Sequence, residues 1–154
     1  MVKYIWWIGE IEVMIHEANH VLGNMCYNPD GSYCEYARAL NEAVTEHIAL
    51  DMVDSFSGDV NNFGFSRYKN NVELLHKLKG ILIENGENPN IIEMSYFTRN
   101  QTKDRILMDA IPDSTYNSII SLMDMIDGGY EGNIPLEARG KAYVTLEGII
   151  ESLK

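Results

Sequence analysis

Apolar residues recur at three- and four-residue intervals over most of the chain, the spacing of one face of an α-helix. The clearest stripe is formed by Val72, Leu75, Leu78 and Leu82. Clusters of Gly, Asn, Asp and Pro separate these segments and mark where each helix should end. Asp113 or Ser114 is expected to cap the helix that ends near Asp127. The pattern predicts helices over residues 10–22, 35–53, 70–84, 89–96, 102–110 and 114–127, and a last helix from Pro135 to the C-terminus.

Only residues 3–8 suggest a strand, because they combine Tyr, Ile and Trp, which favour pleated, half-buried positions. The expected class is therefore mainly α, or α+β at most, with a small β element at the N-terminus. The 154 residues fit one domain over residues 1–154, which is long enough to bury a single hydrophobic core.

The first predicted helix carries a His-Glu-x-x-His motif over residues 16–20. Residues four apart share a helix face, so His16 and His20 can both direct a ring nitrogen to one metal ion. Glu17 lies beside them, where its carboxylate can take a proton from an attacking water. The other side of the helix, which we expect to be buried, is formed by Ile11, Met14, Ile15, Ala18, Val21 and Leu22.

The next predicted helix supplies acidic residues that complement the motif. Glu42 and Glu46 are four apart and share a face with small residues that allow close approach. Glu42 can complete a His/His/Glu zinc site with His16 and His20. Glu46 can accept a hydrogen bond from the outer nitrogen of a ligand histidine and so fix the orientation of that ring.

Together the two segments resemble the gluzincin clan of zinc metallopeptidases, whose best-known fold is that of thermolysin. The resemblance rests on His-Glu-x-x-His followed on the next helix by Asn-Glu-x-x-Thr-Glu over residues 41–46, and it covers about a third of the chain. It implies that Zn²⁺ is held by His16, His20 and Glu42. It also implies peptide-bond hydrolysis with Glu17 as general base, and a supporting role for Asn41 and Glu46 around the ligands.

Two features of gluzincins have no clear counterpart in this sequence. The family carries a β-sheet before the active-site helix, whereas only residues 1–9 precede the helix expected here. Either residues 3–8 supply a minimal edge for the substrate, or an upstream β-subdomain is missing. The family also stabilises the oxyanion with a Tyr or His outside the core motif. The sequence offers Tyr33, Tyr36, His47, Tyr68 and His76 for this role. His47 follows Glu46 directly and points about 100° away from it on a helix, so it is not expected to be a metal ligand.

Two other functions remain open at this point. In the first, the chain is a catalytically inactive zinc-binding domain with a structural or regulatory role, which would hold stoichiometric zinc without hydrolysing any peptide. In the second, both motifs are accidental and the chain is a helical interaction module, which would carry no metal after native purification.

The composition of the chain limits which classes of partner it can bind. The formal net charge of −11 argues against nucleic acid, because an acidic surface repels phosphates, and the expected partner is a peptide or protein substrate. No apolar run is long enough to cross a membrane and no signal peptide is recognised, which favours a cytoplasmic protein. Cys26 and Cys34 can form a disulfide in an exported protein or remain thiols in the cytosol.

Overall fold

The computed structural model describes residues 13–19, 38–57, 68–97, 109–128 and 132–154. Over these ranges every regular element is a helix, which confirms the mainly α class. The strand expected over residues 3–8 lies outside the described residues. The helices are α2 (Arg38–Ser57), α3 (Lys69–Glu84), α4 (Ile91–Phe97), α6 (Asp113–Asp127) and α7 (Leu136–Glu151). Residues 13–19 form a further helical segment, and none of the described helices has the length and apolar character of a membrane span.

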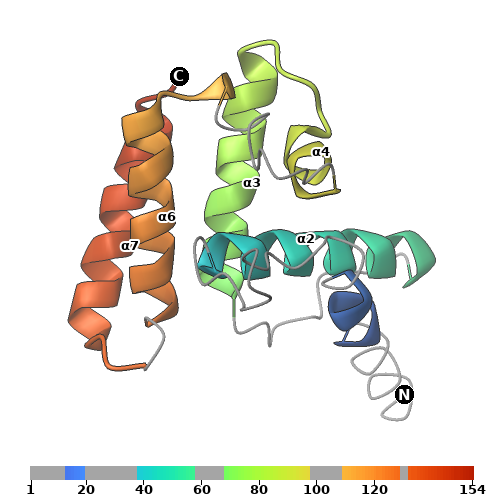
Figure 1. Cartoon of the computed structure of the whole chain (residues 1–154), viewed down its shortest axis with the longest axis horizontal. Helices are drawn as coiled ribbons and strands as arrows, with labels where there is room; N and C mark the ends of the chain where they lie inside the picture. The colour runs from blue at the N-terminus through green and yellow to red at the C-terminus, as the bar shows by residue number, and fades with distance from the viewer. Residues whose placement is uncertain (1–12, 20–37, 58–67, 98–108, 129–131) are drawn as a thin grey trace, which may run out of the picture.

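The helices α6 and α7 run side by side in opposite directions, and α3 packs against both (Figure 1). The helix α2 lies across α3 and α6, at a steep angle to both in the view of Figure 1. The helix α2 also contacts α4, through Thr45 and His47, and the helical segment 13–19 lies beneath α2 in the same view. The segment that carries the N-terminal motif thus packs on the first half of α2, at Glu42 and Glu46.

The hydrophobic core lies where α2, α3, α6 and α7 meet. The stripe predicted on α3 is confirmed, since Val72, Leu75, Leu78 and Leu82 are all buried. Leu74 and Ile81 widen it, so that α3 presents apolar side chains to neighbours on more than one side. Each such side chain stabilises the fold by about 1.5–3 kcal/mol when it leaves water. This central position explains why α3 anchors the other helices.

Two of the predicted helix ends are confirmed and have a clear backbone cause. After α3, Gly86 adopts a φ of +94°, and the Glu87 amide donates to the Leu82 carbonyl at 2.9 Å. After α6, Gly128 adopts a φ of +100°. A left-handed conformation is accessible to glycine without steric cost, so these residues turn the chain and satisfy helix carbonyls at the same time.

Other boundaries differ from the prediction. The helix α2 continues to Ser57 instead of ending near residue 53, because no Gly or Pro interrupts it before Gly58. The predicted cap of α6 was wrong: Pro112 is the N-cap residue, and Asp113 is the first residue of the helix. An acidic residue in the first turn still interacts favourably with the helix dipole. The helix α4 begins at Ile91, two residues after the predicted Pro89.

The start of α2 is fixed to the end of α6 by polar contacts. The Ala39 amide donates to Asp124 Oδ1 at 3.0 Å, and Arg38 Nη2 lies 4.0 Å from Asp127 Oδ2. An amide in the first turn of a helix has no partner within its own helix, so a carboxylate from α6 satisfies it. These contacts fix how α2 is rotated about its axis, and therefore where Glu42 and Glu46 point.

Candidate metal centre

The helical segment 13–19 turns the motif inward, and this corrects the prediction about its buried side. Met14 is 71% exposed and Ala18 is also exposed, although both were expected in the buried face. Instead His16 is half-buried and Asn19 is 3% exposed. The physical reason is that the groups facing the motif on α2 are polar, so the polar side of the segment is the side that packs.

The structure brings His16 together with both glutamates that were expected around the metal. His16 Nε2 lies 3.3 Å from Glu42 Oε2, and His16 Nδ1 lies 2.9 Å from Glu46 Oε2. Glu46 is buried, with a side-chain exposure of 8%, whereas Glu42 is half-buried. His20, the other predicted histidine ligand, lies outside the described residues.

These contacts fit a zinc ion. Zinc ligands each lie about 2.0–2.1 Å from the metal, so two of them in a tetrahedral site are about 3.3 Å apart. The separation of His16 Nε2 and Glu42 Oε2 is 3.3 Å. A carboxylate on the outer nitrogen of a ligand histidine is the usual supporting contact, and Glu46 occupies that place. The donor set of imidazole nitrogen and carboxylate oxygen also suits Zn²⁺.

The charge of the two glutamates acts strongly on His16. Hydrogen bonds with Glu42 and then Glu46 outweigh the effect of burial and raise the pKa of His16 to about 9. Without a metal, the imidazole is therefore protonated at neutral pH, and its positive charge offsets one of the two carboxylate charges. A cation that binds Nε2 has to displace this proton, so the acidic groups favour a positive charge at this point in either state.

Two further predicted residues are placed differently. Glu17 is exposed, next to His16 on the outer surface of the segment. Asn41 is 6% exposed, and its backbone carbonyl accepts a hydrogen bond from Thr45 Oγ1 at 2.8 Å. Glu17 is thus open to solvent, while Asn41 belongs to the buried side of α2.

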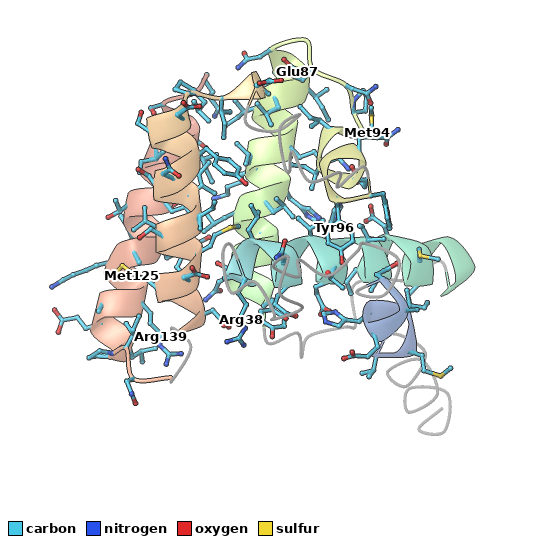
Figure 2. All side chains as sticks on the ribbon, viewed as in Figure 1. Arg38, Glu87, Met94, Tyr96, Met125 and Arg139 are labelled. Atoms are coloured by element: carbon cyan, nitrogen blue, oxygen red, sulfur yellow. The ribbon has the colours of Figure 1, made fainter. Side chains whose placement is uncertain are left out.

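A tyrosine that the sequence did not single out connects the motif to the rest of the fold. Figure 2 shows Tyr96 directed from α4 towards α2. Its hydroxyl lies 2.7 Å from Thr45 Oγ1 and 3.1 Å from the backbone carbonyl oxygen of Asn19. Thr45 follows Glu42 on α2 and Asn19 follows Glu17 on the motif segment, so one phenol group links both halves of the site. No local sequence pattern could have revealed a partner 51 and 77 positions away.

Of the five residues considered for oxyanion stabilisation, Tyr68 lies beside the site. Its ring is parallel to that of His16 within 4°, with ring centroids 6.3 Å apart. Its hydroxyl also interacts with the Arg38 guanidinium at the start of α2. Tyr33 and Tyr36 lie outside the described residues. His47 and His76 belong to a separate cluster on the side of α2 that faces α3 and α4.

A hollow of about 680 Å³ lies elsewhere, between α3, α6 and α7. Its lining includes Glu73, Asp127, Arg139 and Tyr143, and it contains no residue of the His16 site. It therefore does not serve as a substrate groove for that site.

Comparison with known proteins adds no relative. No family model, no curated protein and no solved structure matches this chain. The contacts of His16 with Glu42 and Glu46 are therefore the main indication of function.

Proposed function

We propose that this chain is a zinc-dependent peptidase of the gluzincin type, in which His16, His20 and Glu42 hold Zn²⁺. The observation that carries the proposal is the 3.3 Å separation between His16 Nε2 and Glu42 Oε2, which joins two motifs from different helices at ligand spacing. The same proposal takes the packing of segment 13–19 against α2 as a zincin-like core. Residues 3–8 would supply the edge against which an extended substrate lies.

Each residue of the site has a distinct task in this mechanism. When bound, zinc supplies a Lewis acid that lowers the pKa of a water molecule and polarises the scissile carbonyl. Glu46 accepts the Nδ1–H of His16 and so holds the ring with Nε2 towards Glu42. Glu17 accepts the proton of the attacking water and passes it to the leaving amine. Tyr68, whose ring lies parallel to that of His16, would donate a hydrogen bond from its hydroxyl to the developing oxyanion.

The decisive experiment compares the wild-type chain with Glu17→Gln. Zinc content is measured by elemental analysis after native purification, and hydrolysis is measured on a mixed library of fluorogenic peptides. We expect Glu17→Gln to keep the zinc of the wild type and to lose at least about a hundredfold in turnover, because the amide cannot take a proton. Glu73→Gln, an exposed glutamate on α3, is the matched control and should leave both measurements unchanged.

The outcomes separate the competing functions. A fully active Glu17→Gln protein contradicts the proposed mechanism. A wild-type protein with stoichiometric zinc and no turnover of any peptide supports the inactive zinc-binding domain instead. A natively purified protein without metal supports the helical interaction module.

A further inference from the structure

A second cluster of metal-binding side chains lies where α2, α3 and α4 meet, apart from the residues of the His16 site. His47 and Asp51 are four residues apart on α2 and therefore share a face. His76 reaches the same point from α3. The possible ligand atoms of these three residues lie within 4.8 Å of one another. Two imidazoles and one carboxylate are the ligands that borderline transition metals favour.

A ring nitrogen of His47 and a ring nitrogen of His76 point towards each other. His76 Nε2 lies 2.7 Å from His47 Nδ1, and the rings meet edge to face at 78°. This separation is shorter than the roughly 3.3 Å between neighbouring ligands of a tetrahedral zinc ion, so the exposed His76 would have to shift outward to admit an ion. In the metal-free state one proton bridges the two nitrogens, since two lone pairs cannot face each other at this distance.

A second carboxylate fixes which nitrogen of His47 is available. His47 Nε2 lies 3.0 Å from Glu93 Oε1, and Lys79 Nζ also pairs with this carboxylate. Burial alone would raise the pKa of Glu93, but the hydrogen bonds from His47 and Lys79 outweigh it and hold that pKa at about 2. Glu93 therefore remains an acceptor for Nε2–H, which leaves the lone pair on Nδ1. A carboxylate behind a histidine in this way is the usual support of a metal ligand.

The net charge of this cluster and its exposure to solvent also favour the binding of a cation. Asp51 and Glu93 carry two negative charges and Lys79 one positive charge, so the cluster has one net negative charge when both imidazoles are neutral. The His47 side chain is only 4% exposed, whereas that of Asp51 is 61% exposed. An ion can therefore enter from solvent at Asp51 and still bind the buried side chain of His47.

From this geometry we propose a second metal site, in which His47 Nδ1, His76 Nε2 and Asp51 bind a divalent transition-metal ion of the Zn²⁺ class and join α2 to α3. Asp51 Oδ2 now lies 3.6 Å from His47 Nε2, and its exposed side chain would turn towards Nδ1 to reach the ion. Glu93 and Lys79 orient His47 without contacting the ion. The site shares no ligand with His16, His20 and Glu42, and it does not depend on peptidase activity.

The test titrates the full-length, metal-stripped chain with Zn²⁺ alone and follows the heat of binding. The wild type is expected to take up two equivalents. His76→Gln and Asp51→Asn, both at exposed positions that tolerate substitution, should each lose one equivalent or weaken it at least about tenfold. Glu73→Gln, one turn before His76 on α3, is the matched control and should bind like the wild type. Circular dichroism checks that every variant is folded.

The double variant His16→Ala/His20→Ala distinguishes the two sites. It should retain one equivalent of Zn²⁺, and that equivalent should disappear when His76→Gln is added. The proposal is overturned if both His76→Gln and Asp51→Asn bind Zn²⁺ with the stoichiometry and affinity of the control. It is also overturned if the double variant binds no Zn²⁺ while remaining folded. Neither result bears on the Glu17→Gln experiment, so the two proposals fail separately.

Discussion

The hydroxyl of Tyr96 lies 3.1 Å from the backbone carbonyl oxygen of Asn19, although the two residues are 77 positions apart. The same hydroxyl lies 2.7 Å from Thr45 Oγ1. It has a single proton, so it can donate to only one of these oxygens at a time. The contact is nevertheless a direct link between α4 and the segment that carries the His-Glu-x-x-His motif.

Replacing Tyr96 by Phe should therefore loosen the motif segment. The variant keeps the ring in its buried position and leaves the Asn19 carbonyl without this donor. We expect the free energy of unfolding to fall by about 1–2 kcal/mol, and amide exchange over residues 13–19 to accelerate. Urea unfolding and hydrogen exchange measure the two effects. Tyr143→Phe on α7 is the control, and equal exchange rates over residues 13–19 in both variants would contradict the assigned link.

The two glutamates of α2 should differ in their effect on zinc. Glu42→Ala removes a proposed ligand and should abolish binding at this site. Glu46→Gln keeps the shape of the side chain but weakens the contact with His16 Nδ1, so the affinity should fall about 10–100-fold rather than vanish. Competition with a chelating dye measures both affinities in a His76→Gln background, which removes the second proposed site. Equal losses from the two variants would show that the roles are assigned wrongly.

Tyr68 should affect hydrolysis without affecting the metal. Tyr68→Phe keeps the ring that lies parallel to His16 but removes the hydroxyl. Loss of one oxyanion donor typically lowers kcat about 10²–10³-fold, and we expect a change of this size with KM and zinc content nearly unchanged. Steady-state kinetics and metal analysis test whether kcat falls while KM and the zinc content stay unchanged. A variant with wild-type kcat would remove Tyr68 from the mechanism.

Glu93 should make the stability of the fold depend on pH in the acidic range. Its folded pKa of about 2 lies below the ordinary 4.5, so its contribution is fully present above pH 4.5 and is lost as the pH falls towards 2. Glu93→Gln should lower the free energy of unfolding at pH 7 by about 2 kcal/mol and should flatten the decline below pH 4.5. Urea unfolding with a chelator present measures this. Glu137→Gln, whose side chain is 81% exposed, should behave like the wild type.

Two glycine substitutions should change the stability of the fold in opposite directions. Gly128 has a φ of +100°, and a Cβ at this position would collide with the Arg139 guanidinium. Gly128→Ala should therefore destabilise the fold by about 1–2 kcal/mol. Gly140 lies inside α7 with open space around it, so Gly140→Ala should stabilise the helix by about 0.5–1 kcal/mol. Thermal unfolding compares them, and a stabilising Gly128→Ala would refute the described turn.

The sequence predicted the helical class and much of the core because both depend on local pattern. The stripe from Val72 to Leu82 and the breaks at Gly86 and Gly128 are examples, since helical spacing and glycine conformation act within a few residues. The proximity of His16 to Glu42 and Glu46 also followed from spacing on two consecutive helices. The features that the sequence predicted are therefore those that depend on short stretches of the chain.

The remaining features depend on packing between distant segments. The buried side of segment 13–19 was predicted wrongly because an apolar partner was assumed, whereas α2 presents Glu42 and Glu46. Tyr96 lies on α4 and contacts both α2 and segment 13–19, so its role depends on where that short helix packs. His47 and His76 were recognised only as isolated candidates, since their 2.7 Å contact depends on how α2 packs on α3. Such contacts arise from tertiary structure and leave no periodic signal.

Glu42 and His47 are ligands of different proposed centres and lie five residues apart on α2, so this one helix carries both centres less than two turns apart. Divalent ions at both would repel each other through this one helix, and an effective dielectric constant well below that of water would make the repulsion appreciable. Loading should then be anticooperative, with each ion weakening the other by the same factor. At limiting metal supply, the population should divide into singly loaded molecules before doubly loaded ones accumulate.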